Sequence, residues 1–271
     1  MKNFLLLFVL LSAVAASPCR GAEYRLSMLP RYFPEKLTAM ITPLAEYLSQ
    51  KTGQRMTPVL TDNFARYEAR LLNGTIRIGY ENPLVYVNVS RVHQVLVTAV
   101  KGKGGDRFRG IIIARPDSGI RSPSDLKNKK IMIVGRTSAG GYLSQKIALA
   151  GEGLDVDRDC QLSVAADNRQ ENVIISVAIG DVDAGFIRES ALHKADKYIV
   201  PGSVGVVYRA AWLPNWAFSV DRSLPAALKQ RIRSALLALD SKSPVLQAMG
   251  LKGFKEARDS DYDVMRKFKT R

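Results

Sequence analysis

The chain has 271 residues, of which 46% are hydrophobic and 24% charged; this composition excludes a disordered protein and is typical of a soluble globular one. The length predicts one large domain or two modest ones. A formal net charge of +15 favours a nucleic acid, an anionic membrane or a small anion as partner, but the basic residues are spread from Arg25 to Arg271 without a long block or a nucleic-acid motif. We therefore expect no nucleic acid partner, and charge alone selects no ligand.

The first 22 residues form a segment of their own. Lys2 supplies a positive charge, and the uncharged apolar run from Phe4 to Ala16 has 13 residues, whereas a bilayer-spanning helix needs about 20. The pattern predicts a secretory signal peptide over residues 1–22, cleaved between Ala15 and Ala22. The protein is therefore expected to be exported to the periplasm.

Cysteine and histidine positions indicate neither a metal centre nor a catalytic one. Cys19 could carry a lipid anchor, but Pro18 before it fits that pattern poorly, so we prefer a cleaved signal. Cleavage beyond Cys19 leaves only Cys160, which forms no internal disulfide. His93 and His193 are about 100 residues apart with no nucleophile motif nearby, and we expect surface or hydrogen-bonded histidines.

From Glu23 onward, short apolar strands alternate with amphipathic helices, as in sheets covered by helices. Pro34 opens the first helix, where its missing amide hydrogen costs nothing, and Pro43 should kink the same helix. The first unit is expected to contain strands at 24–29, 56–60, 76–80 and 94–100, with helices from 34 to 53, at 63–72 and at 83–89. The glycine-rich stretch 101–106 is then a turn or flexible connection.

A second unit begins with the β-branched run 110–114. Asn168 with Glu171 resembles a capping box at the start of a helix that Gly180 ends. Ser223 is expected to cap a later helix that Pro225 starts. The expected strands are 130–134, 161–164, 182–187, 205–208 and 217–220, and a further helix is expected at 139–150.

Ligands of open parallel sheets bind beyond the carboxyl ends of the strands, which here are the loops 30–32, 61–63, 80–83, 135–142 and 186–190. The most informative loop holds Arg136, Thr137 and Ser138 before a helix. Two hydroxyls, free amides and the positive end of a helix dipole favour an oxyanion, to which Arg136 could add a forked contact. The alternative is that Thr137 or Ser138 simply caps the helix.

A second cluster, Tyr80, Asn82, Pro83 and Tyr86, could form the wall of a polar site, although a tyrosine at helical spacing is more often part of the core. The glycines of the chain form neither a phosphate-binding nucleotide loop nor a dinucleotide fingerprint. No nucleophile, base and acid come together in the sequence. We therefore expect no cofactor, no metal and no catalytic residue.

The stretch from Arg109 to Ile120, followed by Asp125, Leu126 and Lys127, resembles the opening of the second domain in the phosphate/phosphite/phosphonate-binding proteins of ABC importers. Further pieces follow in the same order at 138–143, 180–185, 213–215 and 261–263, so that the likeness spans about residues 24 to 264. The chain differs at Ala139 and Gly140, which stand where such proteins carry a denser run of hydroxyls.

This resemblance implies the type II periplasmic-binding fold, in which two α/β lobes with mixed, mainly parallel sheets are joined by two hinge crossovers. The first lobe is expected in 23–108 and 207–271, and the second in 109–206. The lobes would close on a small oxyanion of the phosphonate, phosphate or phosphite class. The expected ligand contacts are Tyr32, Thr61, Tyr80, Tyr86, Arg136, Thr137, Ser138 and Ala139.

The same resemblance implies a protein that is not an enzyme, that acts as a monomer and that delivers its ligand to an ABC permease in the inner membrane. The alternative is a periplasmic ligand sensor that uses the same lobes to inform a signalling partner.

Overall fold

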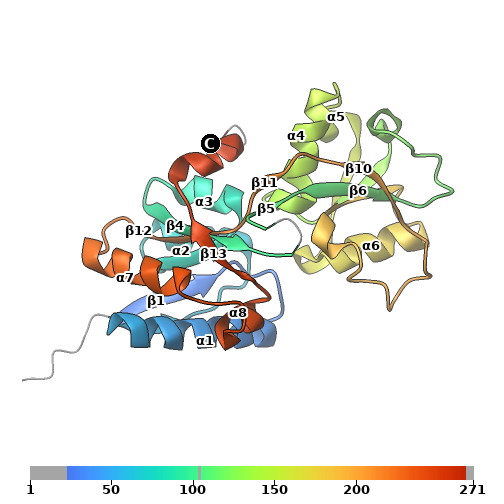
Figure 1. The fold of residues 1–271 in the computed structure, drawn as a ribbon. Helices are drawn as coiled ribbons and strands as arrows, with labels where there is room; N and C mark the ends of the chain where they lie inside the picture. Colours follow the sequence, from blue (N-terminus) through green and yellow to red (C-terminus); the bar gives the residue numbers. More distant parts are fainter. Residues whose placement is uncertain (1–22, 103–104, 267–271) are drawn as a thin grey trace, which may run out of the picture.

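The computed structural model describes residues 23–102 and 105–266, which form two α/β lobes side by side (Figure 1). The predicted signal peptide, with Cys19, lies outside the described residues, as do residues 103–104 of the predicted glycine-rich turn. Within the described part of the chain, no helix has the length and hydropathy needed to cross a lipid bilayer.

The first lobe is built on a six-stranded mixed sheet with the strand order β13-β4-β12-β3-β1-β2. β1 pairs in parallel with β2 and β3, whereas β12 is antiparallel to both of its neighbours and β13 is antiparallel to β4. The strands are β1 (Glu23–Met28), β2 (Arg55–Pro58), β3 (Ile78–Glu81), β4 (His93–Val100), β12 (Ala217–Asp221) and β13 (Gly253–Glu256). The helices are α1 (Pro34–Thr52), α2 (Phe64–Leu72), α3 (Pro83–Val89), α7 (Ala226–Leu237), α8 (Pro244–Met249), α9 (Asp263–Arg266) and the 3₁₀ turn η5 (Asp259–Tyr262).

The second lobe is built on a five-stranded mixed sheet with the order β10-β6-β9-β7-β8. β7 pairs in parallel with β8 and β9, and β6 is antiparallel to β9 and β10. The strands are β6 (Gly110–Ala114), β7 (Lys130–Ile133), β8 (Gln161–Val164), β9 (Ala184–Arg188) and β10 (Gly205–Arg209). The helical elements are η1 (Pro123–Leu126), the wide π-type turn η2 (Ala139–Leu143), α4 (Ser144–Gly151), α5 (Val156–Asp159), η3 (Ala166–Asn168), α6 (Gln170–Ile179) and η4 (Glu189–Ala191).

The two crossovers between the lobes pair with each other. The short strand β5 (Arg107–Phe108) runs antiparallel to β11 (Leu213–Pro214), so both connections form one small ladder. Asn215 follows this ladder, and its amide donates to the Asp106 carbonyl at 2.8 Å. The Tyr262 hydroxyl donates to the Asn215 carbonyl at 3.1 Å, which fixes the crossover to the first lobe.

The hydrophobic core is continuous through the crossovers. One cluster fills the first lobe around α1 and β1. A second cluster runs from Tyr86 in α3 through Phe108 and Leu213 at the crossovers to Ile131 and Phe186 in the second lobe. Apolar contact therefore anchors the hinge on both sides, which fixes where the lobes can move.

Several local predictions hold, because their causes are local. The helix predicted at 63–72 forms as α2, which Asn63 caps by accepting from the Arg66 amide at 2.9 Å, and Gly180 ends α6 with a left-handed φ of 84°. α1 starts at Pro34 as predicted, and it continues through Pro43 without ending there.

Other predictions are wrong. Asn168 does not cap α6, which starts at Gln170; the Asn168 amide nitrogen instead donates to the Val134 carbonyl at 2.8 Å. Ser223 does not cap α7, because its hydroxyl bonds the carboxylate of Asp221. β10 pairs with β6, so the chain leaves the second sheet after Arg209 rather than at residue 207. Both sheets are mixed as predicted, with parallel pairing among β1, β2 and β3 in one and among β7, β8 and β9 in the other.

Candidate ligand-binding cleft

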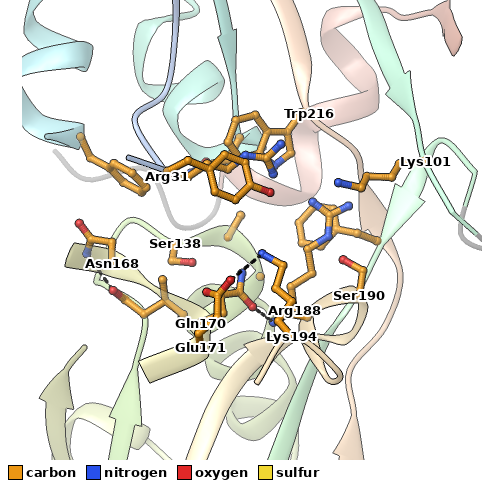
Figure 2. A pocket seen from close by; sticks show the side chains of 18 residues that line it. Arg31, Lys101, Ser138, Asn168, Gln170, Glu171, Arg188, Ser190, Lys194 and Trp216 are labelled. Carbon is orange, nitrogen blue, oxygen red and sulfur yellow. Dashed lines mark hydrogen bonds and ion pairs between the residues drawn. The ribbon is translucent and has the colours of Figure 1, made fainter. Parts of the chain in front are cut away.

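A cavity of about 80 Å³ lies between the two lobes (Figure 2). Because one water-sized group needs roughly 10–15 Å³ of such space, the cavity suits a ligand of a few heavy atoms. It is lined by Arg31, Tyr32, Phe64, Asn82, Lys101, Phe108, Val134, Ser138, Ala139, Gly140, Asn168, Gln170, Glu171, Arg188, Ser190, Ala191, Lys194 and Trp216.

Positive charge dominates this lining. Arg31, Lys101, Arg188 and Lys194 all face the cavity, whereas Glu171 is the one carboxylate among the lining residues. Glu171 pairs with Lys194 at 3.4 Å, as Figure 2 shows. The other three cations have no carboxylate partner among the lining residues, so the cavity has an excess of positive charge.

Arg188 is the last residue of β9 and is only 8% exposed. Its guanidinium lies 4.4 Å from the centre of the Phe108 ring, and Nη2 donates to Asn215 Oδ1 at 3.1 Å. Its Nε is buried and has no hydrogen-bond partner in the described structure. Burial is the main cause, and the charge of Arg31 the second, of a pKa of Arg188 lowered to about 10. The side chain therefore remains charged at neutral pH.

Arg31 faces the same cavity from the first lobe, in the loop after β1. Its guanidinium carbon lies 4.0 Å from the centre of the Trp216 ring and 4.9 Å from that of Tyr32. Nε of Arg31 is also buried and unpartnered among the residues that the structure describes. Lys101 follows β4, and burial together with the charge of Arg31 lowers the pKa of Lys101 to about 8.

Tyr32 responds to these charges. The pKa of its phenol is lowered to about 7, chiefly by the charge of Arg31, while burial opposes the shift and Lys194, Lys101 and Lys36 add to it. A phenol whose pKa is close to neutral shows that the surroundings of the cavity favour negative charge.

The Ser138 loop forms the wall of the second lobe. Ser138 Oγ accepts from the Gly141 amide at 3.2 Å, so the serine caps η2, which was the alternative that the sequence left open. A Cβ on Gly140 would lie 3.0 Å from Cβ of Arg188, and one on Gly141 would lie 2.3 Å from Cγ2 of Val134. Glycine is therefore needed to let this turn approach β9 and the cavity.

Three of the eight predicted contact residues, Tyr32, Ser138 and Ala139, line the cavity. Thr61 is buried, its Oγ1 has no partner among residues 23–102 and 105–266, and it lines an adjoining pocket with Tyr32. Tyr80 lies one layer deeper, with its ring centre 5.2 Å from that of Trp216.

The remaining three predicted residues do not line the cavity. The Thr137 carbonyl accepts from Asn82 Nδ2 at 3.1 Å, a hydrogen bond that bridges the two lobes. Arg136 contacts Asp157 and Tyr142 within the second lobe. Tyr86 donates to Asp259 in the contact between α3 and the end of the chain.

Sequence reasoning missed the cations that define the site. Arg31 and Arg188 lie inside two of the strand-end loops singled out above, and Lys101 directly follows the expected strand 94–100, so the strand-end rule could have found them. Trp216 and Lys194 carried no such signal.

The histidines have no place in the cavity. His93 is buried in the first lobe with Nδ1 2.9 Å from Ser219 Oγ, and His193 is on the surface 3.0 Å from Asp196. Over residues 23–102 and 105–266, no group of three or more histidine, cysteine, aspartate or glutamate side chains could hold a metal ion.

Comparison with known proteins supports a binding role. A family model described as "ABC transporter, phosphonate, periplasmic substrate-binding protein" matches residues 26–262. A curated relative, the tetrathionate sensor histidine kinase TtrS of Salmonella typhimurium, is 24% identical over 211 residues. That match covers 72% of this chain and 36% of the kinase, so the chain spans about a third of its length.

Two solved structures share the fold. PhnD1 from Prochlorococcus marinus, in complex with methylphosphonate, has a TM-score of 0.78 at 14% identity, with 90% of this chain and 96% of that chain covered. The binding component of an ABC phosphonate transporter from Pseudomonas aeruginosa has a TM-score of 0.74 at 15% identity, with 91% and 85% covered. At these identities the likeness concerns the architecture of the two lobes.

Proposed function

Because this chain belongs to the family of periplasmic substrate-binding proteins of phosphonate ABC transporters, we propose that its cavity captures a small oxyanion of the phosphonate, phosphate or phosphite class. The expected two-lobed type II periplasmic-binding fold and the solute-binding role are confirmed by the family match and the two phosphonate-binding relatives. The observation that carries the choice of ligand class is the convergence of four cations on a cavity whose single carboxylate is already paired.

The ligand would contact both lobes at once. Arg31, Tyr32 and Trp216 face it from the first lobe and the crossover, and Ser138 and Arg188 face it from the second. A buried guanidinium without a counter-ion is costly, so a bound oxyanion supplies the charge and the acceptor that the protein lacks. Since these contacts form fully only when the lobes are together, the ligand shifts the equilibrium toward the closed form.

The protein would act in the periplasm as a monomer, without catalysis, and the closed form would dock on an ABC permease. Family membership supports this partner and this location. The high positive charge of the chain favours attraction of anions at a distance, although it does not distinguish between them.

A thermal-shift series tests the proposal. A ligand that binds only the folded state stabilises it and therefore raises the melting temperature. At a ligand concentration of a hundred times Kd, the free energy of unfolding increases by about 2.7 kcal/mol. We expect phosphate, phosphite or methylphosphonate to raise the melting temperature of the protein that lacks residues 1–22, and neutral amino acids to leave it unchanged. The absence of a shift with every oxyanion would contradict the proposal.

A second function, sensing, is favoured by one observation: the curated relative is a sensor histidine kinase, and it matches most of this chain. In that case the closed form would report its ligand to a kinase rather than to a permease. Because the name of that relative includes tetrathionate, this anion belongs in the thermal-shift series. Genes for a permease and an ATPase beside this one would favour transport, and a kinase gene would favour sensing.

A further inference from the structure

We infer that the cavity selects a small anion that carries at least two negative charges and no ammonium group. Within the oxyanion class, it would take dianions without an ammonium group and reject zwitterions such as aminoalkylphosphonates. This inference rests on the proposed function and narrows its ligand.

The first step is the charge of the lining. Four cations face the cavity against one carboxylate, that of Glu171, which Lys194 already engages at 3.4 Å. The acids of the adjoining pocket are occupied as well, since Asp62 pairs with Arg66 and Asp167 with Arg169. A ligand ammonium would therefore meet several positive charges and no free carboxylate in the lining.

The second step is the count of donors and acceptors. Nε of Arg31 and Nε of Arg188 are buried donors without a partner in the described part of the chain, and they belong to opposite lobes. Such a pair suits a ligand that presents acceptor oxygens to both lobes.

Three of the side-chain acceptors that line the cavity are, by contrast, already engaged. Asn82 Oδ1 accepts from the amides of Leu84 and Val85, and Gln170 Oε1 accepts from the Arg188 amide at 2.7 Å. Ser138 Oγ accepts from the Gly141 amide. An ammonium group would have to compete with these donors for the three acceptors, whereas an oxyanion finds the two buried Nε donors free.

The third step is the packing of aromatic rings against the two arginines. Trp216 covers Arg31 with its ring face, and Phe108 covers Arg188 in the same way. These faces hold the guanidiniums in place without adding an acceptor, so the positive charge stays available to the ligand.

Isothermal titration calorimetry with two matched pairs tests the inference. At a pH where both phosphonate groups are fully dianionic, ethylphosphonate and 2-aminoethylphosphonate differ in one ammonium group, and sulfate and methanesulfonate differ in one negative charge. We expect ethylphosphonate to bind at least about tenfold more tightly than its amino derivative, and sulfate more tightly than methanesulfonate, because like charges inside a site are costly.

The outcomes separate the two proposals. Equal or tighter binding of 2-aminoethylphosphonate, or of methanesulfonate over sulfate, would overturn the inference and leave oxyanion capture standing. If none of the four anions binds and the thermal-shift series also shows no oxyanion effect, the proposed function fails and the inference with it.

Two variants identify the residues responsible. Arg188→Met should lose at least about a hundredfold in affinity for the preferred dianion, whereas the control Arg158→Met, an exposed arginine paired with Asp159 on the same lobe, should keep it. Asn215 Oδ1 still accepts from the Trp216 amide when Arg188 is replaced, so the variant should melt no lower than the parent. Lys101→Met tests a second cation of the cavity lining, one that is less buried than Arg188.

Glu171→Gln tests the opposite possibility. If Glu171 receives an ammonium, this variant loses affinity for 2-aminoethylphosphonate selectively, and that result would overturn the inference. We expect instead that discrimination against 2-aminoethylphosphonate is retained or increased.

Discussion

In the proposed role, Arg31 and Arg188 would be single side chains that serve ligand capture at the expense of stability. Each has a buried Nε with no partner in the part of the chain that the structure describes, and the nearest ring faces give partial compensation. Buried charge without a full set of partners is destabilising, and natural binding sites retain it where a ligand completes the set. The lowered pKa values of Arg188 and Lys101 are a measure of the same cost.

Tyr32 gives a pH prediction. Its phenol, with a pKa near 7, is ionised above neutral pH in the unliganded protein because Arg31 is close. A bound dianion offsets the nearby cations and raises this pKa again, so binding takes up a proton, and affinity should fall as pH rises from about 7. Lys101, with a pKa of about 8, acts in the same direction at higher pH.

The measurement is titration calorimetry with phosphite at several pH values, together with the near-ultraviolet difference spectrum of tyrosinate. Ligand should decrease tyrosinate absorbance above neutral pH in the parent, and Tyr32→Phe should lack both this decrease and the part of the pH dependence between about 7 and 8. Identical pH profiles for parent and variant would show that Tyr32 is not the titrating group.

At the scale of elements, the wide turn η2 is one of the parts of the second lobe that line the cavity. Ser138 caps it, Gly140 packs against Arg188, and Gly141 departs from helical geometry with φ −122° and ψ 23°. The turn then continues into the regular helix α4. A loop that must pass this close to β9 tolerates only residues without a Cβ, which explains the two successive glycines.

Gly141→Ala should therefore destabilise the fold. The new Cβ would lie 2.3 Å from Val134 Cγ2, and relieving such overlap costs about 1–3 kcal/mol of unfolding free energy. Gly151→Ala is the matched control, because nothing lies within 4 Å of its added Cβ and alanine in a helix is favoured over glycine by about 0.5–1 kcal/mol. Urea denaturation should lower the midpoint for the first variant only; equal midpoints would contradict the packing described here.

At the scale of the whole molecule, the lobes touch directly at few polar points. Asn82 Nδ2 donates to the Thr137 carbonyl, and the Arg169 guanidinium lies 3.3 Å from the centre of the Phe33 ring. Lys194 Nζ lies 5.1 Å from the centre of the Tyr32 ring, and the paired crossovers β5 and β11 connect the lobes together with the apolar cluster around Phe108 and Leu213. Closure therefore depends strongly on what occupies the cavity between Arg31 and Arg188.

Small-angle X-ray scattering tests this dependence. Saturating oxyanion should decrease the radius of gyration of the parent, because ligand contacts from both lobes favour the closed form. Arg188→Met at the same ligand concentration should keep the larger radius. The same radius for the parent with and without ligand would rule out closure driven by the ligand.

Much of this architecture could be predicted from the sequence, because strands, caps and stops have local causes, as at Asn63 and Gly180. The strand-end rule also located the loops of Arg31 and Arg188. It did not choose between neighbours such as Thr137 and Ser138, of which Ser138 lines the cavity and Thr137 does not, because which side chain faces the cavity depends on packing. The partner of Arg136 is Asp157 on α5, a contact between distant residues that no local pattern encodes.

The strand order has a consequence for how the protein is assembled. β12 lies between β3 and β4, yet its residues follow the entire second sheet in the chain, whose strands all fall within 110–209. During synthesis from the amino end, all strands of the five-stranded sheet are made before β12. Until β12 is made, β3 and β4 lack the strand that lies between them and present open edges. The lobe with which the chain begins is thus the last to be completed.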